Sequence, residues 1–293
     1  MLDKHNYNLW MRVGDIKVKT HFLRRVVSKK IKNWGVNMKI LAIVGSPRTN
    51  GNTYKIIKKI EQRFSEKKNT VEFEFEYVQL SKTKIETCKG CYVCLAKGEE
   101  NCPLKDDREN IELKMKKADA VIFASPVYTY NVSWIMKNFL DRFAFRCHRP
   151  DFHGKKSMVV ISTGAVGLGF VEFVLSFMIG AMGFITCAKA GLTYAPLHEI
   201  DEKKTMKETR KLNKQVDLFY SKIIDKTPIK PSFIKLLTFK MQQKAFSKAP
   251  QNSADFKFWE DNGWLEKKEY YYYKVHVGKI KKLIASLVCK IMA

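Results

Sequence analysis

Two segments of the sequence carry residue types whose spacing could support chemistry. The first, Gly45-Ser-Pro-Arg-Thr-Asn-Gly-Asn-Thr53, follows an apolar run and leads into a helix-forming stretch. Its glycines allow a sharp turn that exposes backbone N–H groups, and its hydroxyl, amide and guanidinium side chains add donors. A helix beginning here would contribute a partial positive charge. The segment therefore predicts a cradle for a phosphate group, the alternative being an ordinary strand-to-helix turn capped by an Asn or a Thr.

The second segment holds four of the seven cysteines and reads Cys88-Lys-Gly-Cys91-Tyr-Val-Cys94, with Cys102 following after seven residues. Three thiolates spaced by two residues can bind three corners of a [4Fe–4S] cube, and a fourth closes it. Structural zinc more often uses two separate Cys-x-x-Cys knuckles, which overlap here. Three interpretations stay open: an iron–sulfur cluster, unliganded thiols, and zinc or a disulfide pair.

The cysteine usage also bears on the compartment. Their number is odd and they are clustered, and no signal peptide is apparent, which differs from a secreted disulfide framework and predicts a reducing cytoplasm. Cys147, Cys187 and Cys289 are interpreted as incidental core or helix cysteines. The longest apolar stretch, 170–187, contains an acid and is shorter than the roughly 20 residues of a membrane span, so we expect a buried helix.

Apolar patterning from Met38 onward predicts the elements that position these segments. Strand-like and helix-like runs alternate five times, which indicates a parallel sheet covered on both faces. We expect a doubly wound α/β fold with five parallel strands in the order 2-1-3-4-5 and a ligand at the carboxyl edge, where loops 45–53, 126–132 and 163–169 meet. The strands are predicted over 39–44, 71–80, 120–124, 157–162 and 184–192, and the helices over 53–67, 106–117, 133–142, 170–182 and 201–225.

This α/β unit, residues 38–225, lies between two predicted extensions. Residues 1–37 hold nine Lys or Arg and two acids, and their apolar residues form a helical stripe over 22–34. The alternative is that translation naturally starts at Met38 and that the 37 preceding residues were assigned to the protein in error. Residues 226–293 form a mainly helical extension that ends in an amphipathic basic helix over 279–292. The net charge of +25 favours anionic partners, but no nucleic-acid-binding motif is present, and a lysine-rich solvated surface is the simpler interpretation.

The phosphate loop resembles that of the NADPH-dependent FMN reductase and iron–sulfur flavoprotein family, whose fold is flavodoxin-like. Ser125-Pro-Val-Tyr128, followed by Lys137-Asn-Phe-Leu-Asp-Arg142, resembles a second motif of that family. Asp141 and Arg142 belong either to this motif or to a solvent-exposed or helix-packing pair. The likeness extends from Met38 to about Pro196.

The resemblance implies FMN as the cofactor and assigns residues to it. In the family the first loop holds the phosphate, and the loop after the third strand lies along the ribityl chain and the flavin ring. It also implies a cluster on Cys88, Cys91, Cys94 and Cys102, although the last gap is longer here than in the family's compact motif. Carried across, the phosphate ligands are Ser46, Arg48, Asn50, Gly51, Asn52 and Thr53, the flavin is lined by Pro126, Val127, Tyr128 and Asn131, and its far edge meets Thr163 and Gly164.

An FMN-dependent oxidoreductase is the function that the resemblance implies. Electrons would come from NAD(P)H or a ferredoxin-like donor and pass to a quinone or another small acceptor. The protein need supply no catalytic nucleophile or acid, since the flavin performs the chemistry. The rival interpretations are a non-enzymatic flavin and iron–sulfur electron shuttle between proteins, and a membrane-surface scaffold without flavin.

Two further expectations concern surfaces. The predicted helix at 170–182 is more apolar than a surface helix requires, which predicts a homo-oligomer whose second chain covers the flavin. The alternative is that residues 226–293 cover this helix within the same chain. The basic helix over 279–292 could contact an anionic membrane peripherally or simply pack within the protein.

Overall fold

The computed structural model describes residues 10–13, 16–19, 36–67, 71–194 and 202–291. Near the N-terminus, β1 (Trp10–Val13) and β2 (Ile16–Lys19) form an antiparallel pair. The helical stripe expected over 22–34 lies outside the described residues. The division of the chain at residues 37 and 225 stays a prediction.

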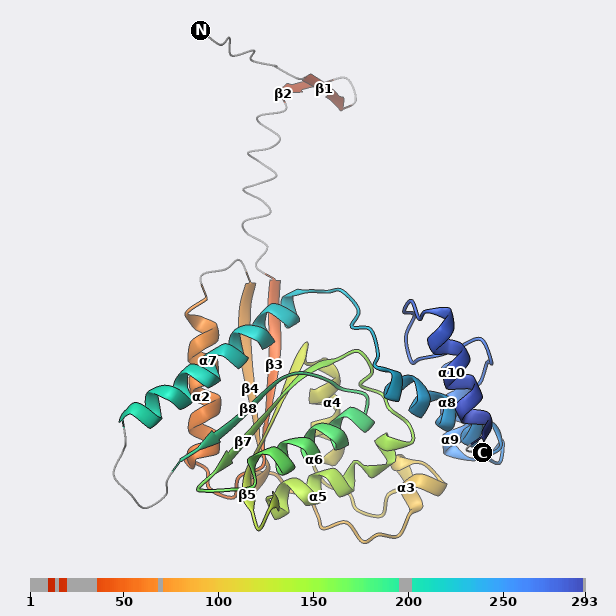
Figure 1. Cartoon of the computed structure of the whole chain (residues 1–293), viewed down its shortest axis with the longest axis horizontal. Helices are drawn as coiled ribbons and strands as arrows, with labels where there is room; N and C mark the ends of the chain where they lie inside the picture. The colour runs from red at the N-terminus through yellow and green to blue at the C-terminus, as the bar shows by residue number, and fades with distance from the viewer. Residues whose placement is uncertain (1–9, 14–15, 20–35, 68–70, 195–201, 292–293) are drawn as a thin grey trace.

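Five parallel strands form the central sheet (Figure 1), and their order is β4-β3-β5-β7-β8. Numbered along the α/β unit, this is the predicted order 2-1-3-4-5. The short strand β6 (Asn131–Val132) adds an antiparallel pairing with the end of β5 that the sequence pattern did not predict. The parallel strands are β3 (Val36–Val44), β4 (Val71–Gln79), β5 (Ala120–Tyr128), β7 (Lys156–Thr163) and β8 (Ile185–Thr193).

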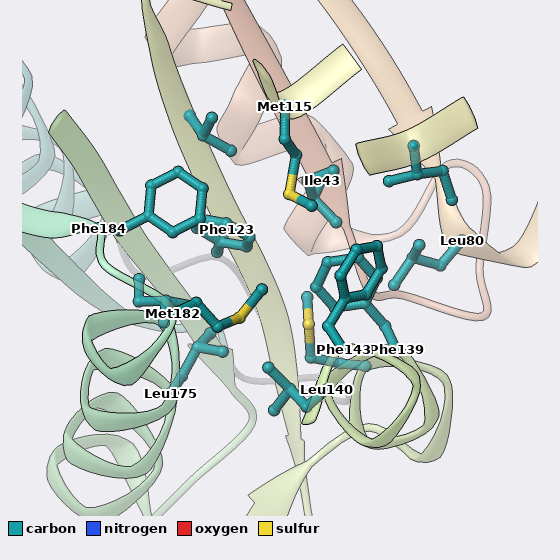
Figure 2. Packing of buried hydrophobic residues seen from close by; sticks show 14 of the residues in the cluster. Ile43, Leu80, Met115, Phe123, Phe139, Leu140, Phe143, Leu175, Met182 and Phe184 are labelled. Carbon is teal, nitrogen blue, oxygen red and sulfur yellow. The ribbon is translucent and has the colours of Figure 1, made fainter. Parts of the chain in front are cut away.

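Helices cover both faces of the sheet, because the inner strands are apolar on both sides. Alternate residues of β3 divide between two cores: Ile40 packs with α2 and α7, whereas Leu41 packs with the helices of the opposite face. Figure 2 shows the second core, in which Phe123 of β5 lies near Phe139 and Phe184. The first face carries α2 (Asn52–Ser65) and α7 (Glu202–Ile224), and the second carries α4 (Arg108–Lys117), α5 (Trp134–Arg142) and α6 (Leu168–Ala181).

Helix α6 corrects the expectation of a fully buried helix. Val171, Leu175 and Ile179 are buried against the sheet, whereas Phe170, Phe173 and Phe177 are 59–64% exposed. An apolar helix on a sheet buries only the stripe that faces the strands, and the described part of the C-terminal extension does not cover the opposite stripe. In the described part of the chain, we find no helix that combines the length and the apolar character needed to cross a bilayer.

Beyond the sheet, α8 (Phe233–Ser247), α9 (Ala254–Asp261) and α10 (Lys279–Ile291) surround an aromatic core of their own. Phe239, Trp259 and Trp264 are buried in it, and the ring centroids of the two tryptophans lie 5.4 Å apart. We call residues 233–291 the C-terminal module. Its helices lie beside the sheet, next to the short helix α3 (Val93–Ala96) that carries Cys94 (Figure 1).

Candidate functional site

The first loop begins at Gly45, directly after β3, and Gly45 is hydrogen-bonded to both β5 and the start of α5. The Gly45 N–H donates to the Ala124 carbonyl of β5 at 2.7 Å, and the Ser133 hydroxyl at the start of α5 donates to the Gly45 carbonyl. A Cβ atom at Gly45 would lie 2.7 Å from the Cβ of Met136 on α5. Only glycine therefore fits where this loop and α5 meet.

Inside the loop, two of the predicted phosphate ligands are already bonded within the protein. The Ser46 hydroxyl is buried, accepts from the Arg48 N–H at 3.2 Å and donates to the Arg48 carbonyl at 3.1 Å. The Thr53 hydroxyl is also buried and lies 2.8 Å from the Ser162 hydroxyl at the end of β7. Both side chains thus stabilise the first loop, and Thr53 connects it to β7, the strand that precedes the third loop.

The side chains of Arg48, Asn50 and Asn52 are exposed at this edge. Helix α2 begins here with Gly51 as its N-cap, without a side-chain cap and without an acid in its first turn. The positive end of a 14-residue helix therefore faces the loop uncompensated by its own side chains. This arrangement suits an anion such as a phosphate group.

The second loop is a tight hairpin between β5 and β6. Val127 pairs with Val132 and Tyr128 with Asn131, which places Thr129 and Tyr130 at the turn with φ angles of 48° and 56°. Left-handed backbone at two residues other than glycine is strained, and such strain is concentrated at functional loops. The predicted flavin-lining residues on it differ in exposure: Pro126 is buried, Val127 is half-buried, and Tyr128 and Asn131 are exposed.

The third loop completes the edge. The Thr163 hydroxyl donates to the Val166 carbonyl at 2.8 Å and so closes a turn around the exposed Gly164. Gly167 has a φ of 91°, and a Cβ there would lie 3.1 Å from a methyl carbon of Val127. The second and third loops therefore pack together, and the structure brings all three predicted loops to one edge of the sheet.

One pocket is lined by all four clustered cysteines. Arg108, Arg142 and Phe145 complete part of its wall. Burial raises the pKa of the Cys94 thiol, and the neighbouring Cys102 and Cys88 raise it further. Among the described side chains, no group of three or more Cys, His, Asp or Glu is arranged to hold a metal ion. The four thiols thus line one pocket without forming a preformed metal site.

Helix α5 holds the cysteine segment in place. The Asn138 amide oxygen accepts from the Cys88 N–H at 3.0 Å, and its nitrogen donates to the carbonyls of Ile85 and Glu86. One turn further on, Arg142 donates to the Glu86 carbonyl at 2.8 Å. Sequence analysis assigned no role to Asn138, although its spacing of four from Arg142 places both on one helix face.

Asp141 and Arg142 form ion pairs with different partners and not with each other. Asp141 forms an exposed ion pair with Lys137 at 2.5 Å, whereas Arg142 is buried against Asp106. Burial alone would raise the pKa of Asp106, but the Arg142 guanidinium and two backbone N–H groups outweigh it and hold the pKa below its usual range. Arg142 is therefore a buried structural cation beside the cysteines and not a partner of Asp141.

Comparison with known proteins assigns the chain to a family. A family model described as NADPH-dependent FMN reductase matches residues 38–192, more than half of the chain. The chain belongs to this family. It is accordingly an oxidoreductase with a flavodoxin-like fold.

Among individual relatives, an iron-sulfur flavoprotein of Archaeoglobus fulgidus is 34% identical over 238 residues, which cover 78% of this chain and all of that protein. An iron-sulfur flavoprotein of Clostridioides difficile is 30% identical over 184 residues, which cover 59% of this chain and 77% of that protein. The crystal structure of RosB with bound 8-demethyl-8-formylriboflavin-5'-phosphate shares the fold at a TM-score of 0.51 and 12% identity. The RosB match covers 83% of this chain and 92% of the other.

The contact between the first loop and α5 generates a prediction about stability. Gly45→Ala should lower the free energy of unfolding by about 1–3 kcal/mol, because the added methyl group meets Met136 and the Ala124 carbonyl. Gly169→Ala on α6 is the matched control, since a Cβ there meets no atom within 4 Å. Urea denaturation followed by circular dichroism measures both, and equal stability of the two variants would contradict the tight junction.

Proposed function

We propose that this family member is an FMN-dependent oxidoreductase that accepts electrons from NAD(P)H or a ferredoxin-like donor and passes them to a quinone or another small acceptor. The observation that carries the proposal is the uncapped N-terminus of α2, which meets the first loop at the carboxyl edge of the sheet. A phosphate at that position would accept hydrogen bonds from the N–H groups of the first helical turn and from the side chains of Arg48, Asn50 and Asn52. Ser46, Gly51 and Thr53 would shape the cradle around it.

The remaining predicted residues would hold the flavin by its other parts. Pro126, Val127 and Tyr128 lie at the end of β5 and Asn131 follows the hairpin turn, whereas Thr163 and Gly164 belong to the third loop, which packs on the hairpin at Gly167. FMN, when bound, supplies the hydride and single-electron chemistry. The protein's part is to orient the ring, exclude water from one face and present the other to the electron donor and acceptor.

We further propose that Cys88, Cys91, Cys94 and Cys102 hold a [4Fe–4S] cluster. Structural zinc more often uses two separate Cys-x-x-Cys knuckles, whereas the two knuckles overlap in Cys88, Cys91 and Cys94. In a cube each thiolate binds a different iron, so the sulfurs stand further apart around a cavity. Four thiols lining one pocket suit that demand, and Arg142 and Arg108 in the wall would compensate the cluster's negative charge.

A non-enzymatic electron shuttle is the second candidate, and the same arrangement supports it. Helix α5 contacts the first loop at its start and the cysteine segment at its middle and its end, so flavin and cluster could relay single electrons between protein partners. Steady-state oxidation of NAD(P)H with a quinone acceptor favours the enzyme. A cytoplasmic location stays a prediction.

The phosphate assignment predicts ligand discrimination. Arg48→Ala combined with Asn52→Ala should weaken FMN binding at least about tenfold, because a charge-assisted hydrogen bond contributes about 1.5–3 kcal/mol. Riboflavin, which lacks the phosphate, should lose little affinity. Arg210→Ala, an exposed arginine on α7, is the control and should leave both affinities unchanged. Fluorescence titration measures all four values, and equal losses for FMN and riboflavin would refute the assignment.

Self-association generates a second prediction. Phe170, Phe173 and Phe177 form an exposed apolar face on α6, which starts directly after the third loop, so a second chain seated there would border the flavin. We expect a mass above the monomer by light scattering at micromolar concentration. Phe173→Glu with Phe177→Glu should restore the monomer, whereas Ile234→Glu on α8, where the side chain is 73% exposed, should not. A monomeric parent protein would disprove this pairing.

Peripheral membrane contact through α10 is the third prediction. Ala285 is buried, but Ile280 and Leu283 are 74% and 62% exposed between lysines, which suits an anionic bilayer surface. Binding to anionic vesicles should weaken with salt and be lost in Ile280→Glu with Leu283→Glu. Co-sedimentation measures this, and binding that is independent of both salt and these substitutions would argue against the contact.

A further inference from the structure

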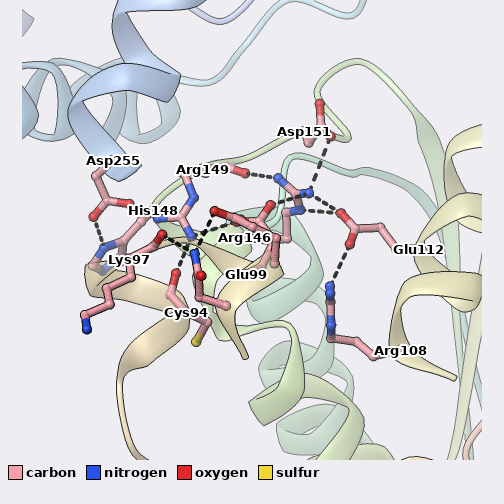
Figure 3. Close-up of polar contacts among 12 residues, drawn as sticks. Cys94, Lys97, Glu99, Arg108, Glu112, Arg146, His148, Arg149, Asp151 and Asp255 are labelled. Atoms are coloured by element: carbon pink, nitrogen blue, oxygen red, sulfur yellow. Dashed lines mark hydrogen bonds and ion pairs between the residues drawn. The ribbon is translucent and has the colours of Figure 1, made fainter. Parts of the chain in front are cut away.

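A buried arginine joins the cysteine segment to the C-terminal module. The side chain of Arg149 is 2% exposed and lies between the two (Figure 3). One terminal nitrogen donates to the Cys94 carbonyl at 2.6 Å and to a Glu99 carboxylate oxygen at 3.0 Å. The other is paired with Asp255, in the first turn of α9. A single guanidinium thus connects α9 to the backbone of one candidate cluster ligand.

The C-terminal module also forms hydrogen bonds with the backbone next to Arg149. Gln242 of α8 donates to the Cys147 carbonyl at 2.7 Å, and the Trp259 indole of α9 donates to the His148 carbonyl at 2.8 Å. His148 also meets the second oxygen of Asp255 at 2.8 Å. Residues 147–149 are therefore held by two helices of the module, each of which belongs to its aromatic core.

On the opposite side, the acid that Arg149 shares is anchored to the sheet domain. Glu99 pairs with Arg146 at 2.9 Å, and Arg146 is in turn bound to Glu112 of α4, which pairs with Arg108 at 2.8 Å. Both arginines stack near the Phe145 ring that lines the cysteine pocket. The charges around the pocket are thus fixed on one side by α4 and on the other by the module, with Glu99 paired to an arginine of each side.

We propose that the C-terminal module is a clamp that holds the cysteine pocket in its ligand-binding shape, with Asp255 and Arg149 as its positioning residues. Asp255 fixes the guanidinium, and the guanidinium fixes the Cys94 carbonyl and, through Glu99, the segment that leads to Cys102. The clamp rests on the proposed function only where a bound cluster is concerned. The order of the cysteine segment before any cluster binds is a property of this chain alone.

The test measures thiol protection in the full chain after chelator treatment, so that no metal shields the cysteines. Asp255→Asn keeps the shape of the side chain but removes its charge, and Arg149→Lys keeps the charge but cannot reach Asp255 and the Cys94 carbonyl together. We expect each variant to raise the rate of maleimide labelling at Cys94 at least about tenfold, as local opening requires. Glu260→Gln, exposed on the same helix, should leave that rate unchanged.

Cys187, on β8, packs against the other core and reports opening outside the cysteine pocket. In both variants labelling should accelerate more at Cys94 than at Cys187, and the FMN content should stay at the parental value. Unchanged labelling of Cys94 in both variants would overturn the clamp, and so would equal acceleration at Cys94 and Cys187, since the effect would then not be local.

A second arm separates this proposal from the cluster itself. After anaerobic reconstitution with iron and sulfide, both variants should lose iron to a chelator at least about tenfold faster than the parent protein, as the same opening of the pocket would require. A parent protein that takes up no iron would reject the cluster but leave the labelling result to decide the clamp. Iron retention equal to that of the parent, together with unchanged labelling, would reject the clamp alone.

Discussion

The hydrogen bond from the Ser133 hydroxyl to the Gly45 carbonyl fixes one end of α5 to the loop that leaves β3. The other end of the helix holds the cysteine segment through Asn138 and Arg142. Because a helix rises about 1.5 Å per residue, Ser133 and Arg142 are separated by about 13 Å along the helix axis. Helix α5, and not a loop, therefore sets the spacing between the sheet and the cysteine segment.

The arginines near the cysteine pocket are buried, which explains why each of them needs a carboxylate partner. Arg108, Arg142, Arg146 and Arg149 are each less than 10% exposed, and each has a carboxylate within ion-pair distance. A buried guanidinium left without its partner is strongly destabilising, so each acid is as necessary as its arginine. In a protein with a net charge of +25, these four cations are set apart from the solvated lysines by their burial around one pocket.

The sequence predicted what depends on local pattern. Alternating apolar residues placed the strands, and the glycines and asparagines of residues 45–53 marked the first loop, because both signals lie within a few residues of each other. The long-range contacts were not predictable in this way: Asn138 lies 50 residues from Cys88, and Arg149 lies 106 from Asp255. The excess apolar character of α6 was predictable, but the residues that face the sheet were not, since Phe170 and Val171 are equally apolar and only the packed sheet distinguishes them.

The central claim is that one chain holds a flavin and an iron–sulfur cluster at the two ends of α5. The most direct measurement is the visible spectrum of anaerobically purified protein, combined with flavin and iron analysis. The account predicts about one FMN and about four irons per chain, with broad absorbance beyond the flavin bands. Protein that keeps its FMN under strict anaerobiosis but contains no iron would contradict the account and leave a flavin reductase with four free thiols.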